Sequence, residues 1–154
     1  MSPFRVSTPV KILIAVDDHS DETARVARNL FPEAEHIIVS ATAMAQFMVV
    51  EPLTGATVTG GYSIDAVLAA DDRADEAVRS AQLIIGADAS TQVEVGPAGE
   101  VICSEAAKQK VDVIVVGRRS HTWLSRLFDP SVSEYVIKHA PCPVLVVSEP
   151  KRVD

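Results

Sequence analysis

The stretch from Val111 to Val147 limits the fold more than any other part of this chain. It contains two short runs of β-branched and aliphatic residues, Val113–Val116 and Val144–Val147. Each run is too short for a globular helix and is typical of a strand buried on both faces. Gly117 is expected to end the first of these strands.

A helix is predicted between the two strands. Ser131 precedes Glu134 by three positions, which is the pattern of a capping box that opens a helix. The helix should stop near His139, because Pro141 cannot continue it. A strand, a glycine-started loop and a helix N-terminus together favour an anion, because the free N–H groups and the helix dipole point at it.

The rest of the chain alternates between predicted strands and helices. Ser20 is expected to cap the first helix through its side chain, and Pro32 to follow its end. The further predicted strands are Lys11–Asp17, His36–Ala41 and Gln92–Val95. The further predicted helices run from Ser20 to about Phe31, from Ile64 to Ile85, and from the turn at Gly96–Glu100 to Lys110. In the first of these helices, one apolar stripe consists of Ala24, Ala27, Leu30 and Phe31. Five strands alternating with four helices predict an α/β fold, a doubly wound parallel sheet with helices on both faces.

The whole chain, residues 1–154, is expected to form a single domain. Residues 1–9 are polar and contain prolines, so they are predicted to be a loosely held lead-in. Residues 42–63 include a Gly- and Thr-rich tract and are predicted to be an irregular, variable crossover loop with an apolar anchor. Such a loop either covers the site as a lid or has no function of its own.

Composition excludes several classes of protein. The chain is 47% hydrophobic, so it can bury a core without a disulfide or a metal. Its formal net charge of −7 and its lack of a basic cluster argue against nucleic acid as a partner. No apolar run is long enough to span a membrane, and the N-terminus lacks the apolar core of a signal peptide, which predicts a cytoplasmic protein. Cys103 and Cys142 lack metal-ligand spacing and are expected to be buried, reduced thiols.

The sequences VIVVG at 113–117 and SVSEYVIKHAPCPVLVV at 131–147 resemble the C-terminal signature of the universal stress protein family. GPAGEV at 96–101 resembles the segment before the family's third helix. The resemblance implies a strand order of 3-2-1-4-5 and a ligand crevice between strands 1 and 4. It also implies a homodimer formed through the last strand, Pro143 to Ser148, which should lie at the edge of the sheet.

The same resemblance implies a set of nucleotide-binding residues. In the family, the aspartate at the position of Asp17 contacts the adenine side, and residues near the end of strand 2 border the base. The candidate residues for ATP or AMP are Asp17, Val39, Gly117, Arg119, Ser120, Ser131, Val132 and Ser133. No metal ligand is expected among them.

The phosphate loop departs from the family pattern. Nucleotide-binding members carry three glycines, and the second and third fall on Ser120 and Pro130 here. Proline lacks an N–H and fixes φ, and a serine in a left-handed backbone would cost about 1–2 kcal/mol. We therefore expect ATP binding to be weakened or abolished. Arg118, Arg119, His121 and Arg126 favour the alternative of retained binding, because they could neutralise phosphate and guanidinium groups suit its oxygens.

Other classes of function are less well supported by the sequence. A nucleophile elbow, a Walker-type phosphate loop and a zinc-protease motif are all absent, so no catalytic set is predicted and the chain is not expected to be an enzyme. Asp17 and Asp18 resemble the magnesium pair of a phospho-receiver domain, but that fold needs an aspartate where this chain offers Ser40 or Gly96. The leading prediction is a homodimeric regulatory or binding protein of the stress response, with an unknown protein partner.

Overall fold

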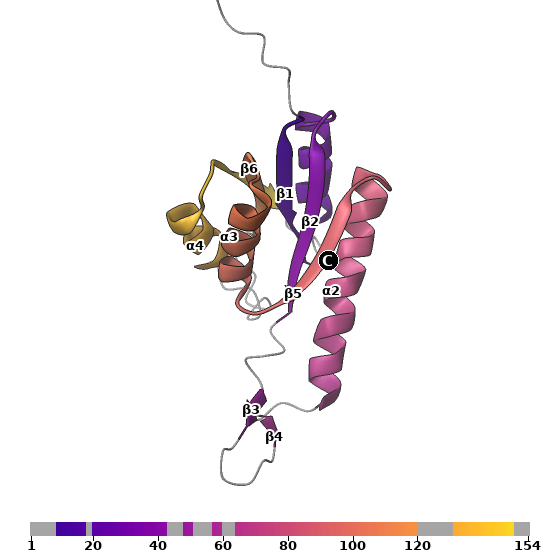
Figure 1. Cartoon of the computed structure of the whole chain (residues 1–154). Coiled ribbons are helices and arrows are strands. Elements are labelled where there is room, and N and C mark those ends of the chain that lie inside the picture. The colour runs from indigo at the N-terminus through magenta and orange to yellow at the C-terminus, as the bar shows by residue number, and fades with distance from the viewer. Residues whose placement is uncertain are drawn as a thin grey trace, which may run out of the picture.

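The computed structural model describes residues 9–17, 20–42, 48–50, 57–59, 64–119 and 131–149. At its centre lies a five-stranded, all-parallel sheet in the order β5-β2-β1-β6-β7 (Figure 1). The strands are β1 (Lys11–Ala15), β2 (Glu35–Thr42), β5 (Ser90–Val95), β6 (Val113–Arg119) and β7 (Val144–Glu149). Counted along the chain, this order is 3-2-1-4-5, which confirms the predicted doubly wound sheet.

Within the described ranges, four helices cover the two faces of this sheet: α1 (Asp21–Leu30), α2 (Ile64–Ile85), α3 (Ala98–Gln109) and α4 (Ser131–His139). Helix α1 packs on β1, β6 and β7, and α2 packs on β2 and β5 of the same face. Helices α3 and α4 contact each other and cover the opposite face (Figure 1). None of the helices that the structure describes is both long and apolar enough to cross a membrane.

The core lies on both sides of the central strand β1. Ile12 and Ile14 point to the layer under α1 and α2, and Leu13 and Ala15 to the layer under α3 and α4. All four side chains are buried. This two-sided burial explains why the strands of this chain are continuous apolar runs instead of alternating patterns.

Helix α1 differs from its prediction at its C-terminal end. Ala24 and Ala27 are fully buried as expected, whereas Leu30 is 58% exposed although it was placed on the same apolar stripe. The helix ends at Leu30, and Phe31 packs against the core in its place. The prediction for Leu30 is therefore wrong.

The segment 42–63 contains a small hairpin that the sequence did not predict. Strands β3 (Met48–Val50) and β4 (Thr57–Thr59) pair antiparallel, with Met48 opposite Thr59. They form a separate two-stranded sheet, apart from the main sheet (Figure 1). The prediction of an irregular crossover is wrong for these residues. The loosely held lead-in falls on residues 1–8, outside the described part of the chain, and on Pro9.

Strand β6 is longer than predicted, because Gly117 does not end it. The strand continues to Arg119, with Gly117 paired to Val147 and Arg118 paired to Ser148. Glycine weakens a strand but does not stop it when a neighbour supplies ladder partners. Here β7 supplies them as far as Glu149.

Candidate functional site

The order of the strands creates a topological switch point between β1 and β6, which is the position of the predicted crevice. Strands β1 and β6 are neighbours, yet β1 leads into α1 on one face and β6 leads towards α4 on the other. In open parallel sheets, such a switch point lies outside the carboxyl ends of the two strands and is the usual ligand site. Ala15 pairs with Val116, so Asp17 follows β1 at about the level where Gly117 and Arg118 lie in β6.

Asp17 is held in a tight turn by Ser20. The backbone N–H of Asp17 donates to Ser20 Oγ at 2.8 Å, and the Ser20 hydroxyl donates to Asp17 Oδ1 at 2.9 Å. Ser20 is only 8% exposed and stands in the N-cap position of α1, but its side chain makes no capping hydrogen bond to the helix. The predicted capping role of the Ser20 side chain is therefore wrong. The hydroxyl orients the carboxylate of Asp17 instead.

Val39 lies in β2, three residues before the carboxyl end of that strand. Its side chain is 1% exposed and belongs to the core under α3 and α4, and its carbonyl accepts the Val16 N–H at 2.9 Å. Ala41 lies two residues nearer the carboxyl end, on the same face, and is half-buried. At the end of β2, Ala41 thus presents the more accessible of these two side chains. The sequence brackets this pair but cannot separate a core position from a rim position.

Thr42, which sequence reasoning missed, ends β2. It is 2% exposed, its carbonyl accepts the Gly96 N–H at 2.9 Å, and its buried Oγ1 has no hydrogen-bond partner among the described residues. An apolar pattern cannot indicate such a buried hydroxyl.

The phosphate side of the predicted site is formed by β6 and α4. Gly117 is half-buried, Arg118 is exposed, and Arg119 is the last residue of β6. Helix α4 begins at Ser131 and packs on β6 and β7, with Val132 partly buried against the core and Ser133 partly buried. The structure thus brings Asp17 and Gly117 to one edge of the sheet. Ser120 lies outside the described residues, as do the side chains of Arg119 and Ser131, and with them the predicted capping box.

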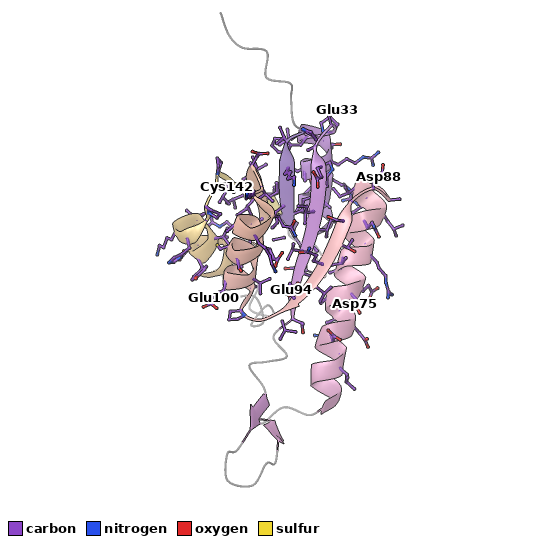
Figure 2. All side chains as sticks on the ribbon, viewed as in Figure 1. Glu33, Asp75, Asp88, Glu94, Glu100 and Cys142 are labelled. Atoms are coloured by element: carbon purple, nitrogen blue, oxygen red, sulfur yellow. The ribbon has the colours of Figure 1, made fainter. Side chains whose placement is uncertain are left out.

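Charge around this end of the sheet is mixed. Figure 2 shows Glu94 and Glu100 at the end where β5 runs into α3, and Glu33 and Asp88 at the opposite end. Glu94 is half-buried and Glu100 is exposed. Among the residues that the structure describes, no three His, Cys, Asp or Glu side chains gather in a way that could hold a metal ion. The described part of this edge of the sheet therefore offers the carboxylate of Asp17, the backbone N–H groups at the start of α4 and the exposed residue Arg118. This set suits a ligand that carries both hydrogen-bond donors and an anionic group.

Comparison with known proteins identifies the family. The model of the universal stress protein family matches residues 10–148. The chain belongs to the universal stress protein family. A universal stress protein of Methanocaldococcus jannaschii is 35% identical over 149 residues, which cover 92% of this chain and 84% of that protein.

Solved structures agree with this universal stress fold. A universal stress protein determined in complex with cAMP has a TM-score of 0.56 and 19% identity, and the match covers 94% of this chain and all of the other. A family protein from Arabidopsis thaliana with AMP bound has a TM-score of 0.57 and 16% identity, with 92% and 93% of the two chains covered. At these identities the similarity shows the fold, and it supports the strand order described above.

Proposed function

We propose that this universal stress protein is a cytoplasmic, homodimeric regulatory or binding protein of the stress response, one that holds ATP weakly or not at all. The observation that carries the proposal is the start of α4 at Ser131. This boundary puts Pro130 directly before the first helical residue, where a phosphate-binding helix normally begins its row of donors.

The loss of one donor is large enough to decide affinity. The first four N–H groups of a helix have no partner within it, and proline at the position before the first helical residue removes one of them. A hydrogen bond to a charged group contributes about 1.5–3 kcal/mol, and about 1.4 kcal/mol changes affinity tenfold. Pro130 alone therefore accounts for roughly a tenfold to hundredfold loss of phosphate affinity. Ser120 in place of a glycine adds to that loss.

The second candidate function is retained binding of an adenine nucleotide. The preserved crevice favours it, because Asp17 is oriented by Ser20 and lies at the same edge as Gly117. The similar structures determined with cAMP and with AMP also favour it. Both of those ligands carry a single phosphate, so they depend less on a complete phosphate loop than ATP does.

Two measurements separate these functions. Freshly purified protein is denatured and the released small molecules are identified by chromatography, and ligand-free protein is then titrated calorimetrically with ATP, AMP and cAMP. We expect no released ATP and no ATP isotherm in the micromolar range. A clean micromolar ATP isotherm would overturn the proposal in favour of the second candidate. We also propose that the protein is not an enzyme, and turnover of ATP above the buffer background would contradict this.

The homodimer is proposed from the position of β7 at the edge of the sheet. The Ile114 N–H donates to the Pro143 carbonyl at 3.0 Å, so the backbone of Pro143 and Leu145 faces β6. By alternation, the N–H and C=O groups of Val144 and Val146 point away from the sheet, where a second copy can pair with them. Light scattering at micromolar concentration should give twice 16.5 kDa, and a mass of 16.5 kDa would refute the dimer.

A further inference from the structure

Two cysteines that play no part in the proposed ligand site lie on the same side of the molecule. Cys103 is in α3, and Cys142 is in the turn between α4 and β7. Both are partly buried free thiols that pack against the core under α3 and α4. Figure 2 labels Cys142 on the side of the sheet that α3 and α4 cover.

Helix packing places Cys103 beside the end of α4 that leads to Cys142. A methyl group built on Gly99 would lie 2.6 Å from Tyr135 Cδ1, so α3 and α4 touch there. Both helices connect parallel strands and so run in the same direction. Cys103 is one turn beyond Gly99 on the same face of α3, and one turn beyond Tyr135 is His139, the last residue of α4. Cys142 follows three residues later, in the turn that leaves this end of α4, and packs against the same core as Cys103.

Neighbouring groups support this placement. Burial raises the pKa of Cys103, and a charge at Cys142 raises it further, in agreement with the packing of both cysteines against the same core. Burial also raises the pKa of Cys142, and the carboxylate of Asp112 raises it further. Both thiols are therefore mostly protonated at neutral pH and react slowly.

We propose that Cys103 and Cys142 form a dithiol that hydroperoxides oxidise to an intramolecular disulfide, linking α3 to the turn before β7. One thiolate attacks a peroxide oxygen, so that an S–O bond forms, the O–O bond breaks and the leaving oxygen takes a proton. The second thiolate then attacks the sulfenic sulfur, so that the S–S bond forms and hydroxide leaves as water after protonation. The two sulfurs together lose two electrons to the peroxide. With hydrogen peroxide the products are one disulfide and two waters.

The bridge would close a segment that carries β6 and α4, which form one half of the crevice. Oxidation would therefore constrain that half while β1 and Asp17 remain outside the closed loop. The proposal does not depend on whether the crevice binds a nucleotide.

The test uses the full chain and hydrogen peroxide at pH 8.5, where more thiolate is present. Protein is then denatured, alkylated with iodoacetamide and weighed by mass spectrometry. We expect a monomer about 2 Da lighter with no alkylated cysteine, a proteolytic fragment joining Cys103 to Cys142, and full reversal by dithiothreitol. Cys103→Ser and Cys142→Ser should each abolish the lighter species and leave a single thiol that dimedone traps as sulfenic acid. Oxidation that gives only sulfinic acids, only chains cross-linked to each other, or no change in the number of alkylated thiols would overturn the proposal.

Discussion

Asp17 and Ser20 hold each other through a reciprocal pair of hydrogen bonds, one from the Asp17 backbone to the Ser20 hydroxyl and one from that hydroxyl to the Asp17 carboxylate. This pair links the end of β1 to the start of α1 and fixes the carboxylate at the edge of the crevice. Because Ser20 is buried, water does not replace these bonds readily when they are removed.

The pair predicts the effect of Ser20→Ala. Loss of the hydroxyl leaves a partly buried N–H of Asp17 without its partner, so the free energy of unfolding should fall by about 1–3 kcal/mol. Urea denaturation followed by circular dichroism measures the change. The matched control is Ser104→Ala, an exposed position in α3, which should stay within about 0.5 kcal/mol of the parent protein. Equal effects of the two substitutions would show that the Asp17–Ser20 pair contributes nothing to stability.

Close contact between α3 and α4 predicts the effect of Gly99→Ala. The added methyl group meets the ring of Tyr135. Overpacking costs about 1–3 kcal/mol, while the better helix propensity of alanine returns about 1 kcal/mol, so a net loss of up to about 2 kcal/mol is expected. In a Tyr135→Ala background the same substitution should be neutral or stabilising, because the clash is gone. If Gly99→Ala lowers the free energy of unfolding by the same amount in that background, the contact with Tyr135 is not the cause of the loss.

His36 predicts a decline in stability below neutral pH. Burial lowers its pKa below 6.5, against weaker opposing effects of backbone hydrogen bonds at Phe31 and Ala27, and its buried Nε2 has no partner in the part of the chain that the structure describes. The unfolded chain therefore takes up the proton first as the pH falls through about 6.5. The stability that neutral His36 provides is present above that pH and is lost progressively down to the lowered pKa of the folded state.

Urea denaturation at pH 7.5 and pH 5.5 measures this decline. His36→Asn keeps a polar side chain but does not titrate, so it should lose less stability between the two pH values than the parent protein loses. If the two proteins lose the same amount, another group causes the decline.

Restoring the glycines of the phosphate loop should restore ATP binding. Pro130→Gly returns one backbone donor, and Ser120→Gly permits a left-handed backbone. The double variant should bind ATP at least about tenfold more tightly than the parent protein, as measured by calorimetry. An unchanged affinity would mean that features other than these two positions limit binding.

The outward backbone of β7 predicts how to separate the dimer. Val146→Pro removes an N–H that points away from β6, so the sheet should survive while the mass measured by light scattering falls to that of a monomer. Val146→Ala removes part of the same side chain but keeps the N–H and should remain dimeric. A dimeric proline variant would show that the copies associate through another surface.

Much of the fold could be predicted because its signals are local. The buried runs at Ile12–Ile14 and Val113–Val116 indicate strands wherever they occur, and the period of apolar residues in Ile64–Ile85 gives both ends of α2 as the structure has them. The order of the strands came from the resemblance to a family, because apolar runs alone do not say which strands pair.

The rest depends on contacts that the sequence does not record. Strand β6 passes through Gly117 because β7 lies beside it, and Ser20 turns back to Asp17 because a hydroxyl at that position has two competing partners. Val39 and Ala41 face the same layer of the core, and only their positions along β2 decide that Val39 is fully buried while Ala41 is partly exposed. The hairpin of β3 and β4 has strands of three residues, too short to give a periodic signal.

The pairing of β1 with β6 joins the first strand of the chain to one made near its end. During synthesis, the segment that carries Asp17 must therefore wait until almost the whole polypeptide has left the ribosome before its neighbour exists. Contacts this distant along the chain are slow to form, since a long loop must close before they repay its entropy. A truncated or nascent copy of this protein cannot contain the crevice, and any ligand that binds there will select chains that have finished folding.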